Sequence, residues 1–254
     1  MITPDLIIAF LTLTFLEVVL GIDNIIFISI LSSRFPIEQR KKLMQIGLFL
    51  AMIMRVLLLM GVNWLTKMQN TWFYFDTEYF SSNISIQTLI LLTGGLFLIY
   101  KSTREIFDKV EADLGNETLE GKSTFSFSRA LFQIVLIDIV FSFDSILTAV
   151  GMTNGVPYAL FIMIAAVVIA ISIMIGFADP VSQFVNKHPS LQILGLSFLL
   201  LIGFMLITEA ASLSETVIFG SSIFTIPKGY LYFAILFSLG VEMLNMRIKK
   251  AKRN

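Results

Sequence analysis

The residues best suited to chemistry lie where acidic side chains are least expected. Glu17 and Asp23 interrupt the apolar run LIIAFLTLTFLEVVLGIDNIIFISIL, and Asp138 and Asp144 repeat their spacing in DIVFSFDS. Carboxylate, amide and hydroxyl oxygens are the ligands that hard cations such as Mg²⁺, Ca²⁺ and Mn²⁺ prefer. The chain has no Cys, so thiolate-bound Zn²⁺ or Cu⁺ is a poor match. The two motifs predict a site for a hard divalent cation, with these candidate ligands: Glu17, Asp23, Asn24, Asp138, Asp144 and Ser145.

One cationic side chain can offset part of the negative charge of these acids. Arg55 lies near the centre of another apolar run, AMIMRVLLLMG. We expect it to act as a counter-ion, or as a gating group that competes with the metal for the carboxylates. Four carboxylates and one guanidinium leave a charge of about −3 when all are ionised, and a divalent cation would reduce it to about −1.

The free-energy cost of placing these acids in a membrane favours a functional role for them. A carboxylate at the centre of a membrane helix costs about 2.5–3.5 kcal/mol, so four that face lipid would cost roughly 10–14 kcal/mol. The acids are therefore expected to face a protein interior or an aqueous cavity. The alternative is that they are structural and satisfied by Arg55 and by hydroxyl groups, although one Arg cannot balance four carboxylates.

The composition predicts a polytopic membrane protein. The chain is 56% hydrophobic and 14% charged, whereas a soluble domain is roughly one quarter charged. Net charge is zero, which gives no sign of a nucleic-acid partner. A bilayer core needs about 20 apolar residues per helix. We expect an all-α fold in a lipid bilayer, one transmembrane domain over 1–254, with spans at 6–31, 43–65, 86–103, 129–152, 156–178, 190–210 and 229–247.

The distribution of basic residues predicts the orientation. With seven spans, fifteen Lys and Arg fall on the side of the first, third and fifth loops and the C-terminus. Only Lys67 and Lys228 fall on the other side. Because cytoplasmic loops carry the excess of positive residues, the N-terminus is predicted outside and the C-terminus in the cytoplasm.

The two acidic motifs also indicate an internal repeat. Each acidic span is followed by two further spans, so two three-helix units precede a seventh helix. An odd number of helices makes the second unit enter from the opposite side, which is an inverted repeat with its site near the midplane, as in many secondary transporters. The predicted parts are repeat one 1–105, a cytoplasmic linker 106–128, repeat two 129–212 and the seventh helix 229–247.

The spacing within each motif suggests a break in the helix. Six residues leave Glu17 and Asp23 about 120° apart on a straight α-helix. Gly21 lies between them, and Gly is a weak helix former. We expect local unwinding at Gly21 and a weaker distortion at the equivalent Ser142, where free carbonyls would help to bind a cation.

Three more polar residues are candidate pathway groups. Glu209 ends the sixth span, and Glu242 with Asn245 lies near the cytoplasmic end of the seventh. Glu242 also fits an interfacial acid whose charge reaches the headgroups. The aromatic stretch WFYF at 72–75 predicts an interfacial belt; a short hairpin there remains open.

The motifs resemble those of a known family. FLEVVLGIDNIIFISIL, QIVLIDIVFSFDSILTAVGM and the run around Arg55 resemble the TerC family of integral membrane proteins. The likeness covers nearly the whole chain and fits the short bacterial subgroup without an appended soluble C-terminal domain. It implies a multi-pass location in the bacterial inner membrane. It implies a role connected with tellurium resistance or, as in several members, manganese export, with the six motif residues as ion ligands.

The expected function is transport of a divalent metal cation. Mn²⁺ efflux is favoured, with Ca²⁺ and Mg²⁺ as alternatives and proton antiport as a candidate coupling. No prosthetic group is expected. No enzyme is expected either, because the LGID and SFDS stretches lack the YD and GxGD signatures of intramembrane aspartyl proteases. The remaining alternative is a membrane-assembly or tellurite- and stress-resistance component with structural acids; the oligomeric state stays open.

Overall fold

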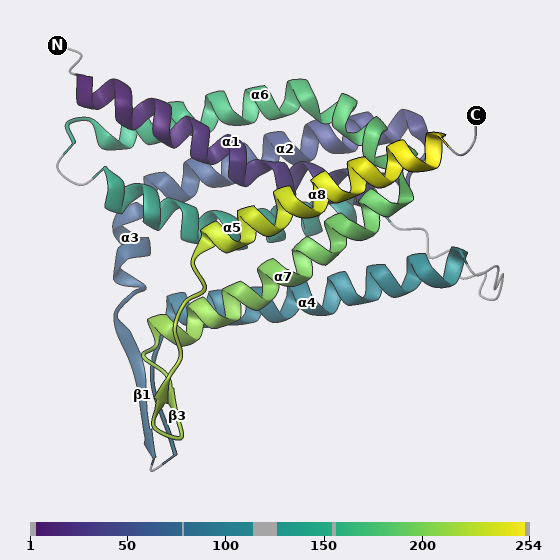
Figure 1. The fold of residues 1–254 in the computed structure, drawn as a ribbon. Coiled ribbons are helices and arrows are strands. Elements are labelled where there is room, and N and C mark those ends of the chain that lie inside the picture. Colours follow the sequence, from purple (N-terminus) through teal and green to yellow (C-terminus); the bar gives the residue numbers. More distant parts are fainter. Residues whose placement is uncertain (1–3, 78, 114–125, 154–155, 252–254) are drawn as a thin grey trace. The chain divides into compact units, whose positions relative to one another are not determined.

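The structure is a computed structural model, and it describes residues 4–77, 79–113, 126–153 and 156–251. Within those ranges the side chains at positions 4, 5, 20, 22, 23, 63, 112, 113, 144 and 249–251 are not described. The described chain is mainly helical (Figure 1). The predicted helical architecture is therefore confirmed in its main features.

Seven described helices are long and apolar enough to cross a membrane, as predicted. A short helix, α3 (Val62–Lys67), follows the second of them. The seven are α1 (Pro4–Ser32), α2 (Ile37–Met60), α4 (Ile86–Asp113), α5 (Phe127–Met152), α6 (Ala159–Lys187), α7 (Pro189–Leu213) and α8 (Lys228–Ala251).

Proline and glycine mark several helix ends. Pro36 precedes α2 with φ −54°, and Pro189 is the first residue of α7, where its missing N–H would lack a partner within the helix in any case. Gly61 separates α2 from α3, and its N–H donates to the Leu57 carbonyl at 2.9 Å. Pro180 lies inside α6 without ending it.

Two helices extend further than predicted. Helix α4 continues past 103, where the third span was predicted to end, to Asp113. The predicted repeat boundary at 105 and the linker 106–128 stay predictions. Charged residues one helical turn apart sustain the helix, as in the Lys101–Glu105 ion pair at 2.6 Å. Helix α6 likewise runs to Lys187 instead of 178. The linker residues 114–125 lie outside the described part of the chain.

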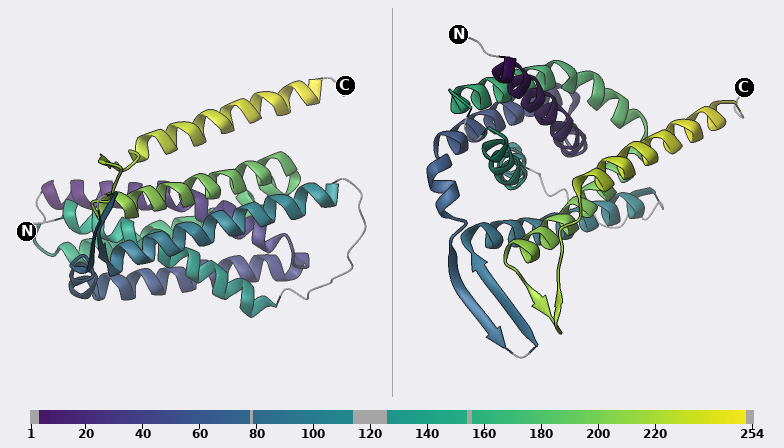
Figure 2. Two further views of the ribbon diagram at one scale, coloured as in Figure 1. Left: turned by 90° about the horizontal axis from the view of Figure 1, so that it is seen from below. Right: turned by 60° about the vertical axis from the view of Figure 1, so that its left-hand side comes forward.

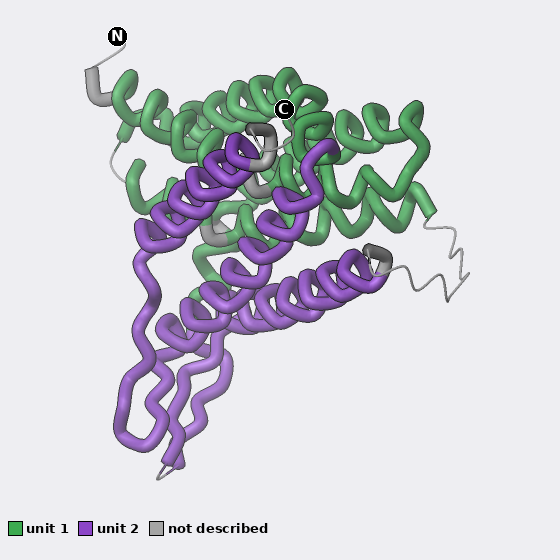
Figure 3. The backbone as a smooth tube through the Cα atoms, turned by 45° about the vertical axis from the view of Figure 1, so that its right-hand side comes forward, with its two compact units in different colours: residues 1–70, 120–186 green, residues 71–119, 187–254 purple. Residues whose placement is uncertain are grey.

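The chain forms two compact units (Figure 3). The first comprises residues 1–70 and 120–186, and therefore α1, α2, α3, α5 and α6. The second comprises 71–119 and 187–254, with α4, α7, α8 and a small sheet. A single transmembrane domain, the inverted repeat and the orientation of the termini stay predictions.

In the first unit, α2 packs against α5, and α1 contacts both. Gly47 allows the close approach of α2 and α5, because a Cβ atom there would lie 3.0 Å from Ile134 Cδ1. Phe35 and Phe127 meet edge to face with ring centroids 6.1 Å apart. The α1–α2–α5 packing brings one acid of each motif, Glu17 and Asp138, to Arg55.

In the second unit, α4 and α7 pack closely along their length. The crossing is reciprocal at two glycines: a Cβ on Gly95 would lie 2.6 Å from the Gly203 carbonyl oxygen, and one on Gly203 would lie 2.9 Å from that of Gly95. Small residues of this kind let helix backbones approach within a membrane. Helix α8 packs on α7.

A four-stranded antiparallel sheet completes the second unit and adds to the predicted all-α fold. The strands follow the order β1-β2-β3-β4. The hairpin left open by the aromatic stretch is therefore present, and Figure 2 gives two further views of it. The strands are β1 (Thr71–Thr77), β2 (Phe80–Ser85), β3 (Val217–Ile218) and β4 (Ser221–Ser222).

Candidate functional site

A buried ion-pair cluster lies where α1, α2 and α5 meet. Arg55 of α2 is 2% exposed, and it bridges Glu17 of α1 and Asp138 of α5, which are 6% and 4% exposed. Its Nη1 donates to Glu17 Oε2. Its Nη2 donates to Asp138 Oδ1 at 2.8 Å, and its Nε lies 3.3 Å from both oxygens of that carboxylate. One guanidinium therefore joins the first acids of the two motifs.

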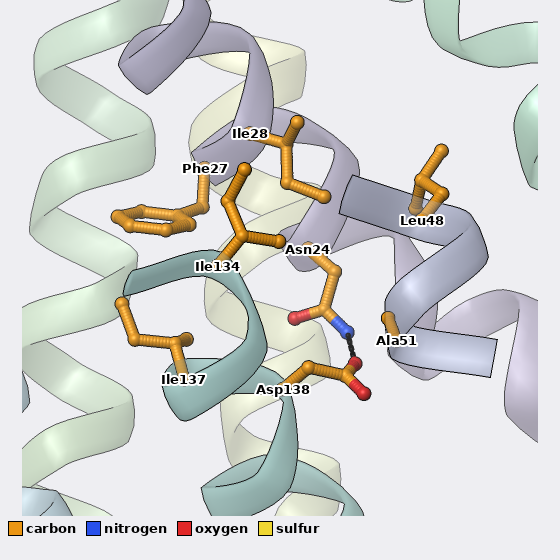
Figure 4. Close-up of a pocket in the computed structure, with 8 residues that line it drawn as sticks. All are labelled: Asn24, Phe27, Ile28, Leu48, Ala51, Ile134, Ile137 and Asp138. Atoms are coloured by element: carbon orange, nitrogen blue, oxygen red, sulfur yellow. Dashed lines mark hydrogen bonds between the residues drawn. The ribbon is translucent and has the colours of Figure 1, made fainter. Parts of the chain in front are cut away.

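Two neutral groups complete the surroundings of Asp138. Asn24 Nδ2 donates to its Oδ1 at 3.0 Å (Figure 4), and Ser142 Oγ donates to its Oδ2 at 3.2 Å. Ser145 instead donates its hydroxyl to the Ser142 carbonyl at 3.2 Å. Asp138 is thus the best-satisfied acid of the cluster, since buried carboxylates need several donors to offset the loss of water.

A small cavity lies beside this cluster. Its volume is about 10 Å³, which is the space that a single water molecule needs. Figure 4 shows apolar side chains from three helices around the Asn24–Asp138 hydrogen bond. The cavity is therefore too small for a hydrated metal ion while Arg55 holds the two carboxylates. Its lining residues are Asn24, Phe27, Ile28, Leu48, Ala51, Ile134, Ile137 and Asp138.

The predicted break in the first motif is wrong. Helix α1 is continuous through Gly21, and α5 is continuous through Ser142. The glycine serves packing instead: a Cβ atom on Gly21 would lie within 2.5 Å of Met174 Cε on α6. Ser142 is buried and points its hydroxyl at Asp138 without distorting the helix.

The structure brings three of the predicted ligands together near Arg55: Glu17, Asn24 and Asp138. The side chains of Asp23 and Asp144 lie outside the described part of the structure. Among the side chains that are described, no group of three or more His, Cys, Asp or Glu could hold a metal ion. The assignment of the six motif residues as metal ligands stays a prediction.

The candidate pathway residues belong to the second unit. Glu209 is half-buried near the end of α7. Glu242 is half-buried on α8, and Asn245 Nδ2 lies 3.4 Å from its Oε2. This local pair does not test the pathway role.

Sequence reasoning missed a buried acid in the second unit. Glu105 is 3% exposed on α4, whereas the sequence placed it at the edge of a solvated linker. It pairs with Lys101, and the neighbouring Ser102 is also buried. A signal existed: Leu91, Leu98 and Glu105 recur every seven residues, which places them on one helix face.

Comparison with known proteins places the chain in a family. The integral membrane protein TerC family matches residues 2–254. The UPF0053 inner membrane protein YgdQ of Escherichia coli K12 is 45% identical over 243 residues, which cover 96% of this chain and 93% of YgdQ. A UPF0053 protein of Haemophilus influenzae is 44% identical over 247 residues, covering 97% and 96%. The UPF0053 protein YegH of E. coli K12 is 44% identical, but the match covers only 42% of its length.

No solved structure matches the chain. The names of the relatives and the seven long apolar helices confirm the expected multi-pass location in an inner membrane. The family matches nearly the full length of the chain, and the chain covers nearly the full length of its relatives. Both findings agree with the motif resemblance. The chain belongs to the TerC family of integral membrane proteins.

Proposed function

We propose that the protein transports divalent metal cations across the membrane, and that Glu17 and Asp138 form the centre of the ion site. The observation that carries this proposal is the pairing of two buried carboxylates from different helices by one guanidinium. A carboxylate pair this deep in a membrane helix bundle is costly unless it has a partner. In the described state that partner is Arg55.

A divalent ion that replaces Arg55 would balance the charge of the two carboxylates. Two carboxylates with Arg55 carry a net charge of −1, and the same carboxylates with a divalent cation are neutral. Binding a divalent ion is therefore an exchange in which the guanidinium leaves and the metal takes its place. Arg55 then acts as an internal competitor that holds the site while no ion is bound.

The donor types favour hard ions. The cluster offers carboxylate oxygens, the amide oxygen of Asn24 and the hydroxyl of Ser142, which suit Mn²⁺, Mg²⁺ and Ca²⁺. We propose Mn²⁺ as the first substrate to test and efflux as its direction, in line with the resemblance that the motifs carry. Titratable carboxylates also permit exchange of protons for the metal, so antiport is the coupling we propose.

A second candidate function rests on the same geometry. Asp138 accepts hydrogen bonds from Arg55, Asn24 and Ser142 without any metal. That arrangement also suits a membrane-assembly or tellurite- and stress-resistance component whose acids are structural. The two functions differ in one observable: in the structural case, conservative changes of the acids impair folding and the purified protein moves no ions.

The experiment is a flux assay with the purified full-length chain in proteoliposomes. Mn²⁺, Mg²⁺ and Ca²⁺ are supplied separately, with and without a pH gradient. We expect flux of at least one ion that is lost in Glu17→Gln and in Asp138→Asn. Glu38→Gln, which changes an exposed acid in the first turn of α2, is the matched control and should retain the flux. Wild-type protein that moves none of the three ions would rule out the transport proposal.

A further inference from the structure

The four-stranded sheet has two chemically different faces. Residues opposite each other in antiparallel strands point to the same face, and Phe73 lies opposite Ile84, as Phe80 lies opposite Ile218. The register therefore gathers five apolar residues with three polar ones on one face, here called the apolar face: Phe73, Phe75, Phe80, Ile84 and Ile218, with Thr77, Ser82 and Ser221. The other face carries mainly polar residues: Tyr74, Asp76, Ser81, Asn83, Val217 and Ser222.

The apolar face is the one turned toward the helices of the same unit. A cavity of about 240 Å³ lies in the corner between the sheet and the adjoining ends of α4 and α7. Its walls combine Phe80, Ile84 and Ile218 of the apolar face with helix residues such as Leu92 of α4 and Ile207 of α7. The polar face points away from this corner.

The direction of the strands is the one expected of a sheet that lies along the membrane surface. In Figures 1 and 2 the strands run across the axes of α4 and α7 at the end where α4 begins and α7 ends. Both helices are long and apolar enough to span a bilayer. A sheet that runs across their ends, with its apolar face on the helix side, faces the bilayer with that side.

The protein itself leaves much of the apolar face uncovered. Phe73 is 53% exposed and Phe75 is 51% exposed. These two rings lie in β1, which is the edge strand of the sheet. A hydrocarbon environment is the one that would remove such aromatic surface from water.

The polar groups around the cavity bond to one another. Ser82 and Thr216 hydroxyls lie 3.1 Å apart, and those of Ser214 and Thr216 lie 2.7 Å apart.

On the polar face the Asp76 side chain hydrogen-bonds Tyr74 and raises the pKa of its phenol. Asp76 is the only charged residue in the four described strands, so these strands carry no Lys or Arg with which to hold an anionic headgroup.

We propose that this sheet rests on the membrane surface and that the corner cavity takes an acyl chain of a bilayer phospholipid. An apolar cavity of about 150 Å³ accepts benzene, so a cavity of about 240 Å³ has room for a segment of hydrocarbon chain. The lining is mainly apolar, and its hydroxyl groups are hydrogen-bonded within the protein. The recognised chemistry is the hydrocarbon chain and not the headgroup charge.

The orientation of the sheet can be measured with neighbouring residues of one strand. The chain has no native Cys, so Phe75→Cys and Tyr74→Cys each give a single site for a nitroxide label in phosphatidylcholine nanodiscs. We expect the label at 75 to be relaxed mainly by oxygen, which concentrates in lipid, and the label at 74 mainly by a water-soluble nickel chelate. Equal chelate access at both sites, or shielding of position 75 from both reagents by another protein surface, would overturn the proposal.

Occupancy of the cavity needs a second measurement. Phosphatidylcholine with a photoactivatable acyl chain should crosslink to residues of the cavity wall in wild-type protein. Ala211→Phe fills the cavity from α7 and Ile223→Trp fills it from the sheet side, so each should lose that crosslink. Leu213→Phe, on α7 but outside the cavity, should keep it. Crosslinks that persist in both filled variants would show that no acyl chain uses this cavity.

Discussion

Replacing Arg55 with Met removes the only cation in the described cluster while keeping an unbranched side chain. Glu17 and Asp138 would then be two buried carboxylates with a few neutral donors between them. Because Arg55 is 2% exposed and contacts both acids, water cannot readily take its place. The variant should therefore be much less stable than the wild-type protein.

The expected loss can be estimated from the two contacts. Removing one partner of a buried ion pair typically costs about 3–5 kcal/mol, because the remaining charge stays buried and uncompensated. Here one guanidinium contacts two carboxylates, which repel each other once the guanidinium is absent. We expect a loss toward the upper end of that range. Lys41→Met, on the exposed side of the same helix, should change stability by no more than about 0.5 kcal/mol.

The informative result is rescue by metal. If the two carboxylates form a cation site, the Arg55→Met protein should bind Mn²⁺ without competition from the guanidinium. A ligand at 100 times its dissociation constant stabilises the folded state by about 2.7 kcal/mol. Unfolding of the detergent-purified protein should then shift with Mn²⁺ concentration, and the shift should be larger in the variant than in the wild type.

Two outcomes would refute this reasoning. An Arg55→Met protein as stable as the wild type would mean that the bridging contacts do not hold the helices together. A destabilised variant that no divalent ion rescues, compared with potassium at equal ionic strength, would mean that the carboxylates are structural. Circular dichroism and elution from a sizing column establish that each variant is folded before the titration.

Three further predictions follow from single contacts. Gly95→Ala places a Cβ atom 2.6 Å from the Gly203 carbonyl oxygen, so its melting temperature in detergent should fall, with a loss of about 1–3 kcal/mol. Ser142→Ala removes one donor from Asp138; it should cost about 0.5–1.5 kcal/mol and reduce flux without abolishing it in the liposome assay. Lys101→Met leaves its partner carboxylate buried and should destabilise the protein more than Lys101→Arg in the same unfolding assay.

Much of the fold could be predicted because a bilayer constrains its helices strongly. Seven apolar runs of sufficient length appear in the sequence and in the structure. The predicted helix ends were less accurate, since a helix such as α4 continues to Asp113 once it leaves the apolar run. Amphipathic continuation of this kind is set by spacing of charged and apolar residues and not by hydropathy alone.

The pairing of the first acids with Arg55 could also be expected from the sequence. Three charged residues in apolar runs must find one another, because lipid offers them no partner. The role of Gly21 could not be expected from the sequence, because the side chain it accommodates, Met174, belongs to a helix far along the chain. A glycine within a membrane helix is compatible with both a break and a close approach, and only the packing decides between them.

The sheet shows where sequence patterns were ambiguous. The WFYF stretch fits an aromatic belt or a hairpin equally well, because both place aromatic residues at the membrane surface. The partner strand β2, FSSNIS, has little apolar alternation, so its pairing with β1 depends on the register. The segregation of the two faces emerges only when the strands are aligned.

Glu17 and Asp138 are proposed to bind a divalent cation as it crosses the membrane. The most direct test is Mn²⁺ flux into proteoliposomes that contain purified wild-type protein or a folded Asp138→Asn variant. We predict flux above that of empty liposomes for the wild type and none above that level for the variant. Equal flux in both would contradict the proposed site, and no flux of Mn²⁺, Mg²⁺ or Ca²⁺ in the wild type would contradict the proposed function.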